Sequence, residues 1–300
     1  MLIRKAERKK AKLRLGISGI SGSGKTWSAL EIAKGMGGKI GMIDTEAGRG
    51  ELYGNNFDYD IIRLDAPYSP DRYIEAIKAF EKAGYDILII DSLSHAWVGE
   101  GGVLSIVDRA GADKFGSGWK TATPMQNHLV DTIINSKMHI IATLRVKSEY
   151  VVEVNSKGKN APRKVGMAPV QRDGLEYEFT VFMDMNNDGN IAHVTKDNTN
   201  MYNQQYLKPS PDMGAKLMEW LNTGIDAKDH FKTVVIPQLI DSISACKDEI
   251  ELKDVYAKAW RSHQAMYPDE FKVVTNAYQR RKTAQNDSEH LGEAQKAGAM

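Results

Sequence analysis

The sequence has few of the features that are typical of secreted or membrane proteins. It contains a single cysteine, Cys246, among 300 residues. A lone cysteine excludes a disulfide framework and a multi-cysteine zinc or iron–sulfur centre. Nor does any run approach the ~18 consecutive apolar residues of a membrane helix. The first fourteen residues also lack the apolar core of a signal peptide, so we expect a cytoplasmic protein without a membrane partner.

Net charge has no dominant sign, because 40 basic and 39 acidic residues give +1. Hydrophobic residues make up 42% and charged residues 26%, as in ordinary globular proteins. Local charge is more informative, since Glu7 is the only acidic residue among the first fourteen, which include seven Lys or Arg. We interpret residues 1–14 as a basic arm. It is either a solvated leader or a contact for phosphates or another subunit.

Short apolar runs alternate with helical patterns from Leu15 onward. Strands are predicted at 15–19, 39–44, 59–64, 86–91 and 139–144. Helices are predicted between them at 26–34, at 70–84 and around 125–133. Strands that alternate with helices predict an α/β fold with a mostly parallel central sheet covered on both faces.

The pattern changes beyond Arg145. Residues 146–165 indicate a basic loop, and two later strands at 175–185 and 190–195 are joined by an Asn/Gly turn. We expect these two strands to extend the sheet in an antiparallel manner. The domains are predicted as a core over 15–223, a helical C-terminal domain over 224–283 and a flexible tail over 284–300.

The strongest motif is Gly-Ile-Ser-Gly-Ser-Gly-Lys-Thr at 19–26, which fits G-x-x-x-x-G-K-[ST] between a predicted strand and a predicted helix. Backbone N–H groups of such a loop bind phosphate oxygens, and the helix directs its positive end at them. Lys25 is expected to reach the β- and γ-phosphates, and the Thr26 hydroxyl to bind Mg²⁺. We therefore predict an ATP site built from Gly19, Ser21, Gly22, Ser23, Gly24, Lys25, Thr26 and Trp27.

Carboxylates follow two of the predicted strands. Asp91 ends an apolar run and is the expected acidic partner of Mg²⁺. Glu46 is the expected group that orients or deprotonates the attacking water, with Asp44 as the alternative. Glu46 could instead cap a helix. Thr143, at the tip of another strand, is expected to sense the γ-phosphate.

The order of these motifs resembles a known family. The P-loop, Asp-Thr-Glu-Ala-Gly-Arg, Ile-Ile-Asp-Ser and Thr-Leu-Arg-Val-Lys are similar to the RecA-type ATPase core. Segments 142–150 and 164–179 resemble, more narrowly, the phage-encoded RecA-like nucleotide-binding proteins of single-strand annealing and recombination. The resemblance spans about residues 14–200. It implies a RecA-like P-loop NTPase core with a small C-terminal helical region, a homo-oligomer (ring or filament) and a bacterial host's cytoplasm.

The same resemblance assigns roles to particular residues. Glu46 becomes the water-orienting carboxylate, and segments 95–118 and 146–165 take the places of two DNA-facing loops. Lys196 would be a catalytic finger that enters a neighbouring subunit's nucleotide site; the alternative is a surface lysine. At Thr143 the sequence departs from bacterial RecA, which has a glutamine that relays nucleotide state to the second loop.

Basic and aromatic residues near the second loop predict contacts to single-stranded DNA, because phosphates favour a basic groove and Tyr150 offers a stacking surface. The predicted contacts are Arg145, Lys147, Tyr150, Lys157, Lys159, Arg163 and Lys164. The expected function is a DNA-stimulated ATPase that promotes annealing or strand exchange. A nucleotide-gated annealing scaffold with negligible turnover and a RecA-fold helicase or loader are the alternatives. A single-strand-binding protein is a possible partner of the C-terminal helices.

Overall fold

The computed structural model describes the backbone of residues 6–109, 117–154 and 160–297, and the side-chain surroundings outside 149–166 and before 286. Contacts divide the chain into two units. One spans residues 11–222, and the other combines the described residues of 1–10 and 223–300. Among the helices described, none is long and apolar enough to cross a membrane.

The larger unit is built on a nine-stranded sheet within the described residues, and its core is mostly parallel. Six neighbouring strands run parallel, in the order β3, β2, β4, β5, β1, β7, and β8 and β9 then continue the sheet antiparallel. This confirms the predicted fold class. The bounds are β1 (Arg14–Gly19), β2 (Ile40–Asp44), β3 (Asp60–Arg63), β4 (Ile87–Asp91), β5 (His139–Val154), β7 (Val181–Met185), β8 (Ala192–Asp197) and β9 (Tyr206–Leu207).

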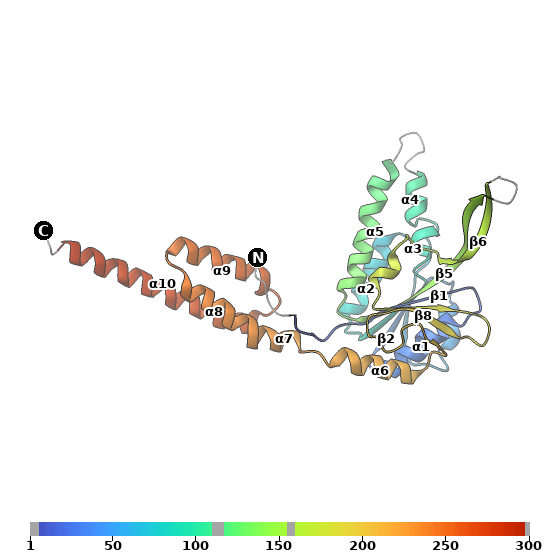
Figure 1. The fold of residues 1–300 in the computed structure, drawn as a ribbon, viewed down its shortest axis with the longest axis horizontal. Coiled ribbons are helices and arrows are strands. Elements are labelled where there is room, and N and C mark those ends of the chain that lie inside the picture. The colour runs from blue at the N-terminus through green and yellow to red at the C-terminus, as the bar shows by residue number, and fades with distance from the viewer. Residues whose placement is uncertain (1–5, 110–116, 155–159, 298–300) are drawn as a thin grey trace. The chain divides into compact units, whose positions relative to one another are not determined.

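Helices cover both faces of the sheet, as Figure 1 shows. Successive side chains of a strand point to opposite faces. In β4, Ile87 and Ile89 therefore pack in the core beneath α1 (Lys25–Met36) and α6 (Pro211–Asn222). Leu88 and Ile90 pack with α2 (Pro70–Lys82) and α5 (Ser117–Asn135) on the other face. A strand buried on both faces explains the unbroken apolar run.

The crossing of α1 and α6 depends on two glycines. A Cβ at Gly35 would lie 1.8 Å from the carbonyl oxygen of Pro211, and one at Gly214 would lie 2.1 Å from that of Ile32. No side chain fits at either position, so the two helix backbones approach directly. Helix α6 thereby fixes the C-terminal half of α1, whose N-terminus follows the P-loop.

The position of the Arg14 side chain differs from that expected for part of a basic arm. Its side chain is buried, and the guanidinium donates hydrogen bonds to the carbonyl oxygens of Ile134, Ser136 and Met138 at 2.8, 2.5 and 2.8 Å. Burial lowers the pKa of Arg14 to about 10. A cation at these carbonyls complements the C-terminal end of α5. Arg14 therefore stabilises the core and does not extend toward a phosphate partner.

The predicted basic loop at 146–165 is largely a hairpin, which corrects the sequence interpretation. β5 continues to Val154 and pairs antiparallel with β6 (Asn160–Pro169). Residues 155–159 lie outside the described part of the chain. The other predicted loop contains two short helices, α3 (His95–Val98) and α4 (Val103–Arg109).

The later strands also differ from the expectation. Residues 175–178 form a 3-10 turn, and β7 pairs with β1 in parallel, so only β8 and β9 extend the sheet antiparallel. A further 3-10 turn, η1 (Arg49–Tyr53), follows β2. The predicted turn at 186–190 does join β7 to β8.

The smaller unit is helical. It contains α7 (Ala227–His230), a π-helical turn (Phe231–Val235), α8 (Ile236–Ala245), α9 (Glu249–His263) and α10 (Pro268–Ala297). Phe231, Leu252, Phe271 and Val274 form its core. Residues 8–10 join this unit, because Ile225 N donates to Arg8 O and Lys10 N donates to Ile225 O. Helix α10 continues through most of the segment predicted as a flexible tail.

Candidate nucleotide site

The glycine-rich loop connects β1 to α1 at the carboxyl edge of the sheet. Gly22 and Gly24 have φ of 81° and 84°, a left-handed conformation that glycine adopts without strain. A Cβ on Gly24 would meet the Asn190 side chain at 3.0 Å. Helix α1 begins at Lys25, so its free N–H groups and positive dipole end face the loop. The loop therefore has the form of a phosphate cradle.

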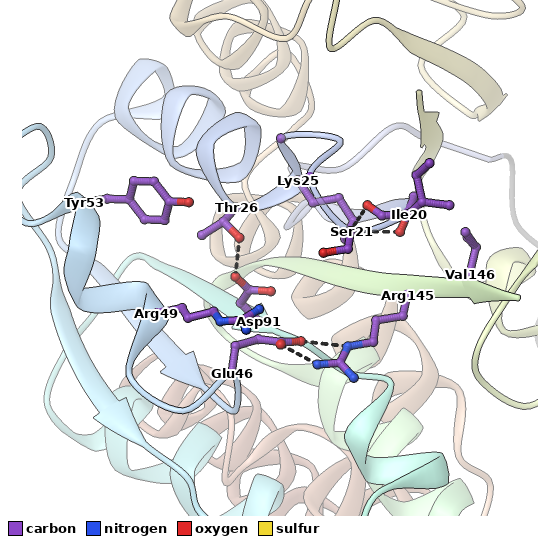
Figure 2. A pocket seen from close by; sticks show the side chains of 13 residues that line it. Ile20, Ser21, Lys25, Thr26, Glu46, Arg49, Tyr53, Asp91, Arg145 and Val146 are labelled. Atoms are coloured by element: carbon purple, nitrogen blue, oxygen red, sulfur yellow. Dashed lines mark hydrogen bonds and ion pairs between the residues drawn. The ribbon is translucent and has the colours of Figure 1, made fainter. Parts of the chain in front are cut away.

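A cavity of about 570 Å³ lies over this loop, as Figure 2 shows. Its volume is in the range of small-molecule sites. Most of the residues predicted for phosphate, metal and water contacts share it. The lining comprises Gly19, Ile20, Ser21, Gly22, Gly24, Lys25, Thr26, Glu46, Arg49, Tyr53, Asp91, Arg145 and Val146.

Lys25 lies at the phosphate end of the cavity. Its Nζ donates to the carbonyl oxygens of Gly19 and Ile20, both at 2.8 Å (Figure 2). Burial lowers the pKa of Lys25, and the negative charges of Asp91 and Glu46 oppose that shift. Phosphate oxygens are stronger acceptors than carbonyls. The Lys25 ammonium can therefore leave the two loop carbonyl oxygens and donate to phosphate oxygens when a nucleotide binds.

Asp91 is oriented by two threonines. Thr26 Oγ1 donates to Asp91 Oδ2 at 2.6 Å, and Thr143 Oγ1 donates to Asp91 Oδ1 at 2.5 Å. Burial of the carboxyl raises the pKa of Asp91, and the two hydroxyls oppose that shift. Thr143 is fully buried behind Asp91 and does not line the cavity. It positions the carboxylate, whereas the sequence predicted that it would sense the γ-phosphate.

The Thr26 hydroxyl and Asp91 carboxylate fit Mg²⁺, which binds hard oxygen ligands and retains several waters. A buried carboxylate with a raised pKa is a charge that a cation would neutralise. When bound, Mg²⁺ would neutralise charge on phosphate oxygens. Within the residues described, no group of three or more His, Cys, Asp or Glu side chains forms a metal cluster.

Glu46 is paired with Arg145 across the cavity (Figure 2). Arg145 Nε donates to Glu46 Oε1 at 2.9 Å and Nη2 donates to Oε2, while Ser92 Oγ also donates to Oε1. Burial alone would raise the pKa of Glu46, but the hydrogen bond and charge of Arg145 outweigh it and lower that pKa. Arg145 was predicted to contact DNA; the structure instead places its guanidinium in the nucleotide cavity.

Asp44, the alternative to Glu46, holds the loop after β2. Its Oδ1 accepts from Glu46 N at 2.6 Å and its Oδ2 accepts from Gly50 N at 3.2 Å. The side chain is fully buried and does not line the cavity. Asp44 therefore positions Glu46, and Glu46 is the carboxylate that faces the cavity.

Sequence reasoning missed three residues of the site. Arg49 and Tyr53 line the cavity from η1. His95 Nδ1 lies 2.7 Å from Thr45 Oγ1, and its ring stacks on Tyr68. Burial, and then the charge of Arg145, lower the pKa of His95. The sequence analysis assigned roles only to Asp44 and Glu46 of the Asp-Thr-Glu-Ala-Gly-Arg motif, although Arg49 is its last residue.

Besides Thr143, two residues predicted for nucleotide binding lie outside this cavity. Ser23 is buried, and its Oγ has no hydrogen-bond partner among the described residues. Trp27 packs edge-on against Phe57, at 4.9 Å between ring centroids. It lines a separate cavity of about 440 Å³ together with Gly24, Glu31, Asn190 and Lys208.

Lys196, the predicted finger, contacts its own chain. Its Nζ donates to the carbonyl oxygens of Tyr177 and Glu176. It pairs with Phe182 near the start of β7, whereas the P-loop lies at the opposite ends of the parallel strands. The structure does not bring Lys196 into the nucleotide cavity of its own subunit.

The remaining predicted DNA contacts follow the hairpin. Lys147 is exposed on β5, and in the backbone register Tyr150 lies opposite Lys164 and Val151 opposite Arg163. Lys157 and Lys159 lie outside the described residues. No contact between these residues and the nucleotide cavity is recorded in the described part of the chain.

A phosphate cradle that leads into a helix, and a metal-binding acid on a neighbouring parallel strand, are the defining parts of a P-loop NTPase. A protein-family model described as "AAA domain" matches residues 11–217, about two thirds of the chain. The chain therefore belongs to the AAA domain family, and its larger unit is a P-loop ATPase domain that binds nucleotide, typically with Mg²⁺. A search of curated proteins found no match.

Proposed function

We infer that this ATPase binds single-stranded DNA along the β5–β6 hairpin and couples ATP turnover to annealing or strand exchange. In this proposal it works as a homo-oligomer, and the C-terminal helices recruit a protein partner such as a single-strand-binding protein. The resemblance of segments 142–150 and 164–179 to phage RecA-like proteins supports the recombination role.

The observation that carries the proposal is the continuity of β5. Thr143 and Arg145 of this strand contact the two carboxylates of the nucleotide cavity. The same strand continues to Val154 as one half of the hairpin. A nucleotide and a strand of DNA bound at these places would therefore contact one continuous element. The basic residues Lys147, Arg163 and Lys164 supply the charge that phosphates attract.

Each residue of the site has a distinct role in ATP hydrolysis. Lys25 and the loop N–H groups bind phosphate oxygens, and Thr26 and Asp91 would hold Mg²⁺. Glu46 would orient the attacking water as an ionised carboxylate, because its lowered pKa keeps it charged at neutral pH. In phosphoryl transfer, positioning and charge neutralisation account for most of the rate.

ATP hydrolysis with and without single-stranded DNA tests the proposal on the wild type and Lys25→Ala. We expect DNA to stimulate the wild type and Lys25→Ala to lose turnover. Lys78→Ala, an exposed lysine of α2, is the matched control. An ATP hydrolysis rate that single-stranded DNA does not change would contradict the coupling of ATP turnover to DNA binding. The double variant Lys147→Glu, Lys164→Glu should weaken DNA binding and reduce its salt dependence by about one counterion per lost cation.

One observation favours the nucleotide-gated scaffold as the second candidate. Glu46 is bound bidentately by Arg145, an arrangement that withdraws the carboxylate from water activation. A scaffold would keep this pair with ATP bound and show negligible turnover. If Glu46→Gln binds DNA in an ATP-dependent way as well as the wild type, and the wild type hydrolyses no ATP, the scaffold is the better account.

A further inference from the structure

Arg145 and Thr143 lie on the same side of β5, because side chains of a strand alternate with a period of two. Thr143 contacts Asp91 and Arg145 contacts Glu46. One strand therefore contacts the predicted metal-binding acid and the predicted water-orienting acid. A small shift of β5 would alter both contacts together.

The backbone of Arg145 lies at the root of the hairpin. Its N–H donates to Ser94 Oγ at 2.9 Å, and its carbonyl oxygen accepts from Val170 N at 2.7 Å. Val170 directly follows β6, and the next residue of β5, Val146, pairs with Pro169. Arg145 belongs to one arm of the hairpin and is hydrogen-bonded to Val170, which follows the other arm, at the point where the hairpin leaves the sheet.

The side chains of the pair differ in freedom. The Arg145 side chain is 46% exposed, whereas that of Glu46 is 15% exposed and is also bonded to Ser92. The guanidinium is therefore the partner that can change position. Its planar donors fit a carboxylate and a phosphate equally well, and a γ-phosphate carries more negative charge than a carboxylate.

We propose that Arg145 distinguishes ATP from ADP and transmits the difference to the hairpin. With ATP in the cavity, the guanidinium leaves Glu46 for a γ-phosphate oxygen, which frees Glu46 and moves the root of the hairpin. With ADP, the pair with Glu46 re-forms. This inference rests on the proposed function only in that the cavity binds ATP.

A matched arginine separates this role from simple charge attraction. Arg49 lines the same cavity but belongs to η1. Arg49→Ala removes the same charge from the cavity and leaves β5 untouched. Arg145→Ala removes the charge together with the link to the hairpin. Arg145→Lys keeps the charge but loses the planar donor pair.

The experiment places a fluorophore on the hairpin. Met167, on β6 opposite Ser148, is exposed and is replaced by cysteine in a Cys246→Ser background, so that one thiol is labelled. Calorimetry first measures binding of ADP and of a non-hydrolysable ATP analogue with Mg²⁺. Probe emission is then recorded with each nucleotide in the wild type, Arg145→Ala, Arg145→Lys and Arg49→Ala.

Arg49 lines the binding cavity, so emission is compared at nucleotide concentrations that calorimetry shows to be saturating for each variant. Under those conditions we expect the analogue, but not ADP, to change emission in the wild-type background and in Arg49→Ala. Arg145→Ala should still bind the analogue but lose the emission change, and its preference for the analogue over ADP should fall by about tenfold. Arg145→Lys should recover only part of either effect.

Three outcomes would overturn the inference. The first is an emission change that survives in Arg145→Ala, and the second is an equal loss in Arg49→Ala. The third is a wild-type probe that stays silent although calorimetry shows the analogue bound. Absence of nucleotide binding in the wild type is a different result, because it removes the proposed function itself and is visible before the probe is read.

Discussion

Thr143 Oγ1 donates a 2.5 Å hydrogen bond to Asp91 Oδ1 and so joins β5 to the carboxyl end of the neighbouring strand β4. The other carboxylate oxygen accepts from Thr26. Asp91 is therefore fixed in orientation without a metal, while burial raises its pKa. Burying this charge destabilises the fold when no metal is bound, and a bound cation offsets that cost.

Asp91→Asn should consequently change stability with opposite signs in two conditions. In EDTA without nucleotide, the variant should be as stable as the wild type or more stable, because the neutral amide avoids burying a charge. With Mg²⁺ and an ATP analogue, the wild type should gain stability and the variant should not. Thermal unfolding measures both, with Asp58→Asn in an exposed loop as the control. If Mg²⁺ and the ATP analogue also stabilise Asp91→Asn, the metal-binding role of Asp91 is contradicted.

The raised pKa of Asp91 also sets a pH trend in the absence of metal. The folded state binds this proton more tightly than the unfolded chain does, so stability increases as pH falls from neutral through the raised pKa. As the pH falls, the free energy of unfolding of the wild type should therefore rise relative to that of Asp91→Asn. Urea unfolding of both proteins, from neutral pH down to about pH 4, near the ordinary pKa of an aspartate, checks the sign.

Arg145→Ala should shift the pH dependence of ATP hydrolysis. Arg145 opposes the effect of burial and lowers the pKa of Glu46 more than His95 or Ser92 does, so its removal raises that pKa although the two weaker influences remain. The acid limb of kcat/KM should then move to higher pH, because Glu46 must be ionised to orient water. Arg49→Ala, which leaves the Glu46 pair in place, is the control. An unmoved acid limb in Arg145→Ala would exclude Glu46 as the titrating group.

Gly35→Ala should destabilise the ATPase domain by about 1–3 kcal/mol, as expected for an overpacked contact. The added methyl would lie 1.8 Å from Pro211 O, so α1 and α6 must separate. Gly54→Ala is the matched control, because Gly54 has φ of −61° and the nearest atom to an added Cβ is 3.4 Å away. Urea unfolding compares the two. Equal stabilities would mean that the helices can separate at no cost.

Arg14→Ala should lower the free energy of unfolding by roughly 3 kcal/mol, because it leaves buried carbonyls without a charged donor. The carbonyls of Ile134, Ser136 and Met138 all lose their partner. Arg63→Ala, which removes an exposed pair with Asp65, should leave the free energy of unfolding close to that of the wild type. If the two variants lost similar amounts in chemical denaturation, Arg14 would not be a core residue.

Much of the nucleotide site could be predicted from the sequence, because its parts lie at strand ends. A parallel sheet places the carboxyl ends of its strands at one edge, so Lys25, Glu46 and Asp91 were expected to meet there, and they do. Arg145 was misassigned for the same reason. It directly follows the predicted strand 139–144, but β5 continues through it, and its side chain lies on the same side of the strand as Thr143 and enters the cavity.

The hairpin and the parallel pairing of β7 were harder to predict. Gly158 and Asn160 suggested a loop, and they outweighed the β-branched residues Val151, Val152 and Val154, which favour a strand. The Asn/Gly turn after β7 correctly predicted a hairpin with β8. It could not show that β7 itself lies next to β1, because that pairing joins residues about 165 positions apart in sequence.

The close crossing of Gly35 and Gly214 constrains the order in which the protein can be completed during synthesis. The helix that follows the P-loop is made early, but the backbone that packs against it is translated about 175 residues later. A nascent chain that stops before Pro211 exposes the face of α1 that α6 covers, including Ile32 and Met36. The packing of α1 is therefore completed only after the ribosome has translated α6, although the last residue that lines the nucleotide cavity is Val146.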